Sequence, residues 1–143
     1  MKLSIGSDHA GFALKSTLVA YLKEKGYDIV DRGTHADSSV DYPPFAHRVA
    51  EDITRGESEL GVLICGSANG VCMTANKHAG IRAALCWMPE IADLARKHNN
   101  ANILCLPARY LSVEVALACM EVFLSTSFEG GRHENRVNQI DCI

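Results

Sequence analysis

The sequence lacks long hydrophobic runs, and it is poor in aromatic residues and in net charge. Its 143 residues are 48% hydrophobic, 22% charged and only 6% aromatic, with a net charge of −3. No apolar run approaches the roughly 20 residues that a membrane span needs, and residues 1–5 look like a strand rather than a signal peptide. A weakly acidic chain is a poor match for nucleic acid. We therefore expect a cytoplasmic protein with neither a membrane nor a nucleic acid as its partner.

Disulfide and metal-binding patterns are also missing. The chain has six cysteines, but no two of them form a Cys-x-x-Cys pair, and nothing points to an oxidising compartment. Most lie in apolar segments, where Cys86, Cys105 and Cys119 are best explained as core thiols. The histidines show no H-x-H or H-E-x-x-H spacing, so their spacing gives no argument for a metal site.

The sequence does contain a regular alternation of apolar and amphipathic segments. We expect strands at residues 2–7, 27–31, 60–65, 81–86 and 102–106. Helices are expected at residues 10–25 and 43–54, from the loop after residue 66 to about residue 76, at 88–97 and after Ser112, with a last short helix ending near residue 140. The helix after Ser112 should bury the residues Val113, Ala116, Leu117, Met120 and Leu124.

This alternation predicts one α/β domain over residues 1–143, with five parallel strands between two layers of helices. We choose the flavodoxin-like strand order 2-1-3-4-5. Ligands in such folds bind beyond the carboxyl ends of the strands, between the first and third strands. That rule brings Asp8 and His9 close to Cys65, Gly66 and Ser67.

Cys65 is the main candidate for chemistry, because it ends a buried strand and precedes a glycine-containing loop that opens a helix. Backbone N–H groups and the helix dipole stabilise anions there. The same field should lower the pKa of the Cys65 thiol and make it a usable base or nucleophile. A buried core thiol is the alternative.

The loop Gly66-Ser67-Ala68-Asn69-Gly70 could hold a phosphate or an oxyanion. It is neither a Walker loop nor a G-x-G-x-x-G dinucleotide loop. It also lacks the arginine that a cysteine phosphatase needs, since Val71 stands at that position. An ordinary strand-to-helix turn is the alternative.

Three further polar groups have both a functional and a structural interpretation. Asp8-His9 could bind hydroxyls and protons, or Asp8 could simply cap the following helix. The run His98-Asn99-Asn100 could hold a sugar, or merely end a helix. A basic group near the C-terminus could bind phosphate or form a solvated face; it consists of Arg132, His133 and Arg136, with Arg109 as a further candidate.

Several motifs in their order along the chain resemble those of the ribose-5-phosphate isomerase type B family. They are Gly6-Ser7-Asp8-His9-Ala10-Gly11-Phe12, Asp41-Tyr42-Pro43, Cys65-Gly66-Ser67, Ala75-Asn76-Lys77, Gly80-Ile81-Arg82-Ala83-Ala84, His98-Asn99 and Gly130-Gly131-Arg132-His133. The family also holds galactose-6-phosphate and allose-6-phosphate isomerases. The resemblance implies a Rossmann-like fold and conversion of ribose 5-phosphate to ribulose 5-phosphate without metal or cofactor. It further implies a homodimer or a tetramer, with active sites built from two subunits.

The resemblance also implies a role for each matching residue. Cys65 corresponds to the base that moves a proton between C2 and C1, and Ser67, where many members have threonine, assists at the substrate oxygens. His98 opens the sugar ring, with Asp8 at the ring oxygen or a nearby hydroxyl. The remaining matches are sugar contacts at Tyr42 and Asn99, phosphate contacts at His9, Arg109, Arg132 and Arg136, and enediolate contacts at Gly66, Ala68, Asn69 and Gly70.

One departure from the family pattern lies in this loop, which usually reads Cys-Gly-Thr-Gly-x-Gly. Ala68 lacks the backbone freedom of glycine, whereas Asn69 tolerates a left-handed conformation and adds a side-chain donor. Two alternative functions stay open. One is an isomerase of a 6-phosphorylated hexose, and the other is a non-catalytic module that binds a sugar phosphate.

Overall fold

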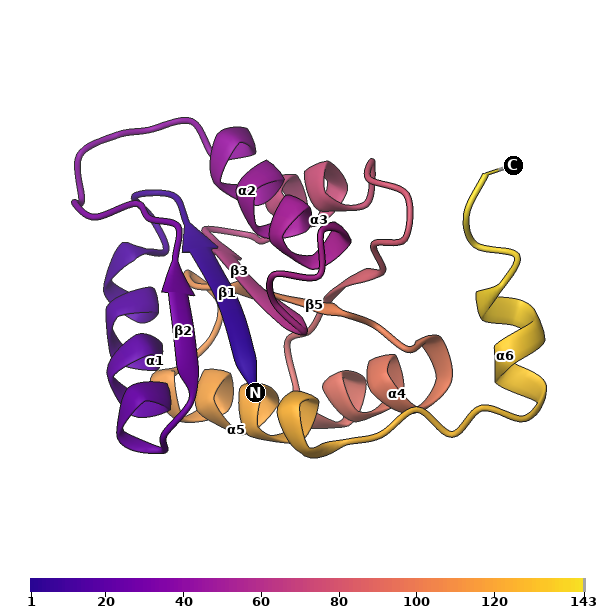
Figure 1. Ribbon diagram of the computed structural model, residues 1–143. Helices are drawn as coiled ribbons and strands as arrows, with labels where there is room; N and C mark the ends of the chain where they lie inside the picture. Colours follow the sequence, from indigo (N-terminus) through magenta and orange to yellow (C-terminus); the bar gives the residue numbers. More distant parts are fainter. Residues whose placement is uncertain (143) are drawn as a thin grey trace.

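The computed structural model describes residues 1–142 and shows a parallel sheet between two layers of helices (Figure 1). The strands are β1 (Lys2–Ser7), β2 (Asp28–Asp31), β3 (Leu60–Cys65), β4 (Ala83–Leu85) and β5 (Ile103–Pro107). The helices are α1 (Phe12–Glu24), α2 (Pro43–Thr54), α3 (Asn69–Ala75), α4 (Pro89–Asn99), α5 (Val113–Ser125) and α6 (Arg132–Val137). The predicted α/β class is confirmed.

Helices α2 and α3 cover one face of the sheet, and α1, α4 and α5 cover the other (Figure 1). Successive side chains of a strand point to opposite faces, so the buried strand β3 contributes side chains to the cores on both faces of the sheet. Val62 and Ile64 pack on the side of α1, α4 and α5, whereas Leu63 and Cys65 pack with α2 and α3. The position of Cys65 in the strand therefore fixes the face on which its thiol lies.

The predicted strand order is wrong at one edge of the sheet. The observed order is β2-β1-β3-β5-β4, so β5 lies beside β3, and β4 forms the edge. Every residue of β5 is buried, whereas the three residues of β4 are only partly buried. The longer apolar strand thus takes the inner position, where both of its faces are covered. Because both segments are apolar, the sequence did not distinguish the two orders.

The core face predicted for α5 is also only partly right. Ala116 and Met120 are fully buried as expected, but Cys119 and Phe123 are buried as well, and Val113 is 43% exposed. The helix is apolar on most of its surface, so its periodicity gives a weak indication of which side faces the sheet. The predicted cap is confirmed, since the Ser112 hydroxyl accepts a hydrogen bond from the Val115 N–H at 3.2 Å.

The outer edge of β4 is occupied by a side chain. The Asn76 amide donates to the Ala83 carbonyl oxygen at 2.9 Å and accepts from the Ala83 N–H at 2.8 Å. A neighbouring strand would make the same two hydrogen bonds.

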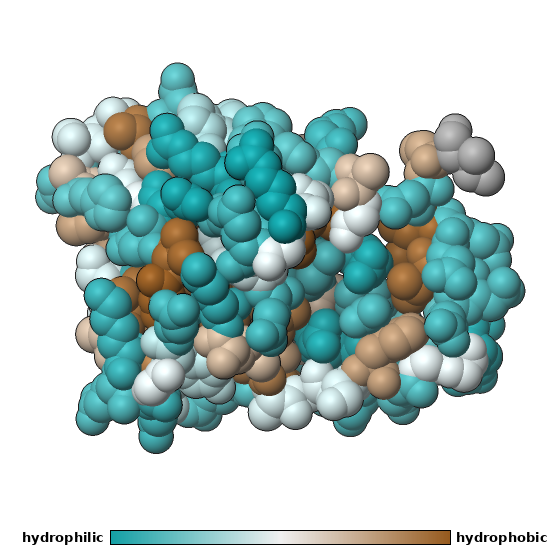
Figure 2. All heavy atoms as spheres, viewed as in Figure 1, coloured by the Kyte–Doolittle hydropathy of each residue, from teal (hydrophilic) through white to brown (hydrophobic). Residues whose placement is uncertain are grey.

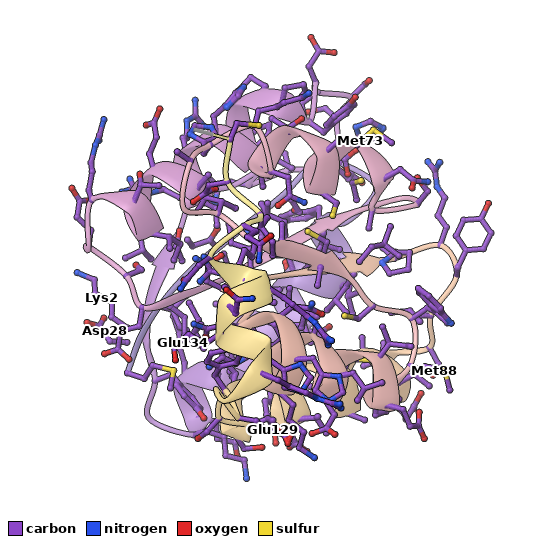
Figure 3. The ribbon with its side chains drawn as sticks, turned by 90° about the vertical axis from the view of Figure 1, so that its right-hand side faces the viewer. Lys2, Asp28, Met73, Met88, Glu129 and Glu134 are labelled. Atoms are coloured by element: carbon purple, nitrogen blue, oxygen red, sulfur yellow. The ribbon has the colours of Figure 1, made fainter. Side chains whose placement is uncertain are left out.

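The C-terminal segment stands away from the sheet, and its helix α6 packs against α4 (Figures 1 and 3). Figure 3 looks onto this side, where Glu129 and Glu134 lie on the segment in front of the rest of the molecule. Farther along, the Asp141 carboxylate accepts from the Gly80 N–H at 3.1 Å. Within residues 1–142, no helix has the length and apolarity required to cross a membrane.

Candidate active site

Cys65 ends β3 at the carboxyl edge of the sheet and is 5% exposed. The chain beside it is held by hydrogen bonds from neighbouring strand ends. The Asp8 N–H donates to the Ile64 carbonyl at 3.3 Å, and the Ala108 N–H donates to the Cys65 carbonyl at 2.9 Å. The ends of β1, β3 and β5 therefore meet around this thiol, as the strand-end rule predicted for Asp8 and Cys65.

The prediction that the pKa of the Cys65 thiol is lowered is wrong for the single chain. Burial raises the pKa of Cys65, and the negative charge of Asp8 raises it further, although backbone hydrogen bonds at Val71, Ala68 and Ser67 act in the opposite direction. Helix α3 has only seven residues, so its dipole does not outweigh burial. The thiol is therefore largely protonated at neutral pH, and its thiolate is a strong base once formed.

The remaining cysteines divide into two groups. Cys86, Cys105 and Cys119 are buried, which confirms their prediction as core thiols. Burial raises the pKa of Cys86 to about 12 and that of Cys119 to about 11. Cys72 is only partly buried and Cys142 is exposed, so burial does not protect these two from reagents.

In the loop after Cys65, alanine rather than asparagine takes the left-handed conformation. Ala68 has a φ of +63°, and Asn69 is already the first residue of α3. The Asn69 side chain instead donates to the Ser67 hydroxyl at 3.2 Å. A left-handed residue beside right-handed ones turns successive backbone N–H groups toward one side, which forms an anion-binding concavity. The alanine thus retains the turn that glycine would make, at a cost in strain.

In the pair Asp8-His9, Asp8 has a structural role, whereas His9 keeps one ring nitrogen available for a ligand. Asp8 is 8% exposed, and its carboxylate accepts from the Gly11 N–H at 3.1 Å, so it holds the turn that leads into α1. The His9 Nδ1 accepts from the Val40 N–H at 3.2 Å. This contact leaves Nε2 as the nitrogen of His9 that carries a proton and can donate to a ligand.

Two glycines let side chains approach the loop closely. Arg109 follows β5, and its Nη1 lies 3.1 Å from the place where a Cβ on Gly66 would stand. The Tyr42 ring lies against Gly70, where a Cβ would overlap it. Arg109 and Tyr42 are thus brought to the predicted anion loop from distant parts of the sequence. We name Asp8, His9, Tyr42, Cys65 to Gly70 and Arg109 the carboxyl-edge group.

The other predicted site residues lie at the opposite edge of the sheet. His98 and Asn99 end α4, just before β5 begins, whereas Cys65 ends β3. Since Gly61 pairs with Ile103 and Cys65 with Pro107, the two edges are about 13 Å apart along the strands. Within residues 1–142 the chain does not bring His98 to Cys65. We name the residues at this second edge the α4–α6 group: His98, Asn99, Arg132 and Arg136.

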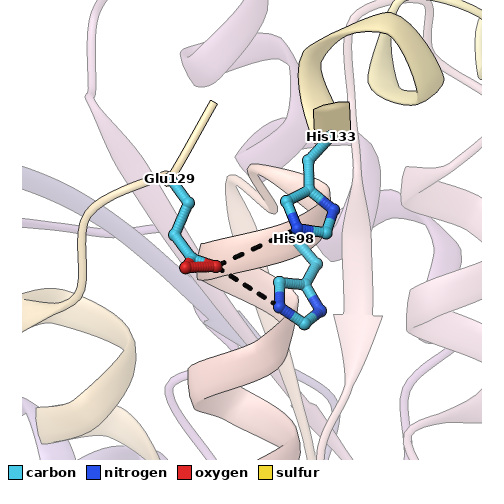
Figure 4. Close-up of side chains that lie close together, drawn as sticks. All are labelled: His98, Glu129 and His133. Carbon is cyan, nitrogen blue, oxygen red and sulfur yellow. Dashed lines mark ion pairs between the residues drawn. The ribbon is translucent and has the colours of Figure 1, made fainter. Parts of the chain in front are cut away.

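A triad of His98, Glu129 and His133 joins α4 to α6 and to the segment before α6 (Figure 4). The Glu129 Oε1 lies 3.4 Å from the His98 Nε2 and 3.9 Å from the His133 Nε2. Burial lowers the pKa of His133, and the charges of His98 and Arg132 lower it further, so this imidazole is neutral at pH 7. Sequence analysis missed the triad because His98 lies 35 positions from His133, outside any short motif.

A cavity of about 450 Å³ lies between the C-terminal segment and the region around β4. Its lining includes Lys77, His78, Ile81, Arg82 and Ile140, and Figure 2 shows hydrophobic surface where the segment stands off from the body. Of the predicted site residues only Asn99 lines this cavity. It is thus distinct from the surroundings of Cys65.

A thiol at a strand end, next to an anion-binding loop and cationic side chains, places this chain among α/β proteins that bind small anionic ligands beyond their strands. The model of the family described as Ribose/Galactose Isomerase matches residues 3–140. The chain therefore belongs to this isomerase family, and the resemblance stated from its motifs is confirmed.

Curated and solved relatives agree over nearly the full chain. Ribose-5-phosphate isomerase B of Escherichia coli is 42% identical over 142 residues, which cover 99% of this chain and 95% of that protein. The structure of a ribose 5-phosphate isomerase from Thermotoga maritima is 49% identical, has a TM-score of 0.97 and covers 98% of this chain and 97% of its own. The structure of ribose-5-phosphate isomerase B from Mycoplasma genitalium with bound ribulose-5-phosphate is 42% identical and has a TM-score of 0.93. It covers 97% of this chain and 93% of its own.

Proposed function

We propose that the protein interconverts D-ribose 5-phosphate and D-ribulose 5-phosphate, as a cytoplasmic enzyme that needs no metal or cofactor. The observation that carries this proposal is the close match to a relative whose structure holds ribulose-5-phosphate. The position of Cys65 supports it, because the thiol ends β3 beside the loop whose backbone N–H groups can stabilise an anion, and proton removal next to a carbonyl needs a positioned base.

In the proposed reaction His98 first opens the furanose ring, with Asp8 at the ring oxygen or a neighbouring hydroxyl. The Cys65 thiolate then takes the proton from C2 of the open-chain aldose and returns it to C1. The O2 hydroxyl loses its proton and the O1 oxygen gains one, and the Ser67 hydroxyl assists this exchange. The net result moves the carbonyl from C1 to C2 with no change in the total number of hydrogens.

The intermediate between these two steps is an enediolate, whose negative charge needs fixed donors. The loop of Gly66, Ser67, Ala68, Asn69 and Gly70 offers backbone N–H groups around the left-handed Ala68. Tyr42 and Asn99 contact the sugar, and His9, Arg109, Arg132 and Arg136 hold the phosphate. Binding energy at the phosphate can orient the reacting carbons at the other end of the substrate.

We further propose a homodimer in which each active site takes the carboxyl-edge group from one subunit and the α4–α6 group from the other. A single chain separates these two groups by about 13 Å along its strands. A two-fold axis can place one edge of a subunit against the opposite edge of its partner. Exposed apolar side chains such as Met73, Trp87 and Tyr110, which are 65%, 53% and 76% exposed, offer surface for such contacts.

The test of the activity is an isomerisation assay on a panel of aldose phosphates. We expect rapid conversion of ribose 5-phosphate, with solvent deuterium entering the sugar. Faster turnover of allose 6-phosphate or galactose 6-phosphate would assign the hexose reaction instead. Tight binding of ribose 5-phosphate without conversion or deuterium uptake would make the protein a binding module.

The test of the shared site mixes Cys65→Ala and His98→Ala proteins, each inactive on cyclic substrate, under conditions that allow subunit exchange. A mixed dimer then has one site with both lesions and one site with neither. Random exchange should restore about a quarter of the parent's activity, since half of the dimers are mixed and each has one intact site. No recovery, with exchange verified by native mass spectrometry, would show that both residues act from one chain.

A further inference from the structure

We propose that His98, Glu129 and His133 form a binding site for a divalent transition-metal ion, with Zn²⁺ as the best fit. We also propose that an ion held there blocks ring opening by occupying the His98 imidazole. The second statement rests on the function proposed above, whereas the first is independent of it.

The three side chains already have nearly the spacing that a zinc ion requires (Figure 4). Zinc binds nitrogen and carboxylate oxygen at about 2.0–2.2 Å, so ligand atoms around a tetrahedral ion lie about 3.4 Å apart. The Glu129 Oε1 is 3.4 Å from the His98 Nε2 and 3.9 Å from the His133 Nε2. One ligand atom from each residue lies within 4.8 Å of the others, and an ion between them requires one imidazole to rotate out of the parallel stack so that both ring lone pairs converge on it.

The backbone holds these residues together without a metal. Glu129 is fixed next to α4, because its N–H donates to the Lys97 carbonyl at 3.1 Å. His133 lies four residues later in the first turn of α6, where its N–H donates to the Gly130 carbonyl at 3.1 Å. The His98 and His133 rings stack with centroids 4.2 Å apart and planes 10° apart. Their Nε2 atoms lie 3.4 and 3.9 Å from the same oxygen of the Glu129 carboxylate.

The ligand types select the class of ion. Two imidazoles and one carboxylate suit Zn²⁺ and its neighbours, and three protein ligands leave a fourth position for water. The side chains of His98 and Glu129 are 38% and 48% exposed, so that position is open to solvent. Mg²⁺ and Ca²⁺ prefer oxygen ligands and are poor candidates.

The same ion would change what His98 can do. A metal-bound Nε2 has no free lone pair and carries no proton, so it cannot exchange a proton with a sugar oxygen. The predicted consequence is reversible inhibition that is specific to the cyclic substrate. Open-chain sugar does not need the ring-opening step.

The binding test uses tag-free protein stripped of metal, titrated with Zn²⁺ by calorimetry and with Co²⁺ by visible absorption. We expect one ion per chain at this site and the absorption of tetrahedral Co²⁺. Glu129→Gln and His133→Asn should each weaken binding at least about tenfold. Both residues lie outside the core, and circular dichroism checks that the variants fold. Parent-like affinity in Glu129→Gln would overturn the site.

Matched controls come from two other groups that can bind zinc. His47 and His78 approach each other, with Nδ1 and Nε2 2.7 Å apart, and Cys142 is exposed. His47→Asn and Cys142→Ser should leave the Co²⁺ absorption and the affinity at the triad unchanged. Loss of the signal in either control variant, with retention in Glu129→Gln, would assign the ion to another place and overturn the proposal.

The inhibition test compares each protein's rate with and without micromolar Zn²⁺, on cyclic ribose 5-phosphate at short times. The parent's rate should fall and return on addition of a chelator, while Glu129→Gln should keep more of its own metal-free rate. An active parent that is indifferent to saturating Zn²⁺ would overturn the blocking role. Equal inhibition of parent and Glu129→Gln would do the same. A metal-free parent without isomerase activity would instead refute the proposed function and leave the binding result intact.

Discussion

The aromatic ring of Tyr42 fills the space that a side chain on Gly70 would need. Tyr42 stands at the start of α2, and Gly70 lies in the first turn of α3. The two helices are thus brought together at the proposed sugar pocket by a residue that has no side chain.

Gly70→Ala should therefore displace the Tyr42 ring and raise KM for ribose 5-phosphate, with a smaller effect on kcat. The double variant Gly70→Ala/Tyr42→Ala should be no worse than Tyr42→Ala alone, because the overlap is gone. Steady-state kinetics of the three variants measures this coupling. Additive losses would show that Gly70 acts without Tyr42.

The ionisation of Cys65 should depend on Asp8. Burial and the Asp8 charge raise the thiol pKa, so the alkylation rate of Cys65 should increase with pH beyond the range of an ordinary thiol. Asp8→Asn removes the charge but keeps an oxygen for the Gly11 N–H, and it should shift this profile toward lower pH. Peptide mass spectrometry separates Cys65 from Cys72 and Cys142, and sugar phosphate should protect only Cys65. An unchanged profile in Asp8→Asn would contradict the electrostatic coupling.

The proposed phosphate contacts should depend on α6. Arg132→Ala and Arg136→Ala each remove a charge-assisted contact worth about 1.5–3 kcal/mol, which corresponds to a rise in KM of about tenfold to a hundredfold. Arg55→Ala is the matched control, because Arg55 is exposed just after α2 and forms an ion pair with Glu51 at 3.7 Å. If the variants lost as much activity on unphosphorylated ribose as on ribose 5-phosphate, the arginines would be supporting the fold.

Stability in acid should depend on Asp52. This carboxylate is 2% exposed and accepts from the Ser4 hydroxyl at 2.7 Å and from the Arg32 Nε and Nη2 at 2.8 and 2.6 Å. Burial alone raises its pKa, but the hydrogen bonds from Arg32 and Ser4 lower it more, so the pKa of folded Asp52 lies below its ordinary value.

Because the folded pKa is depressed, Asp52 stabilises the fold above its unfolded pKa, and this contribution is lost as the pH falls through the folded pKa. In Arg32→Met the hydrogen bonds from Arg32 no longer offset the effect of burial, so the pKa of folded Asp52 is less depressed. The loss of stability in acid should therefore be smaller than in the parent. Urea unfolding between pH 7 and 3 measures the difference, with Arg55→Met as the control. Parallel curves for the parent and Arg32→Met would rule out this linkage.

Local sequence signals predicted the strands and helices well where apolar runs had clear ends. The observed bounds of β1, α2 and β3 match the predicted ranges, and each of these elements is bounded by glycine, proline or a short polar loop. The order of β4 and β5 could not be read in the same way, because it depends on how deeply two apolar strands are buried in the finished sheet.

The candidate site was predictable in part for a similar reason. The strand-end rule brought Asp8 to Cys65 across 57 positions, and the family motifs named most of the remaining residues. The thiol pKa was wrong because burial is a property of the packed core rather than of the motif. Glu129 was missed because it becomes significant only through the hydrogen bond of its backbone to α4.

The amide of Asn76, which satisfies both backbone groups of Ala83, limits how this sheet can grow. Exposed edge strands invite pairing with another chain, which leads to open-ended aggregation. At Ala83 the hydrogen bonds that an added strand would need are already taken. The β4 edge therefore cannot add a strand at this residue, which blocks one route to open-ended fibres.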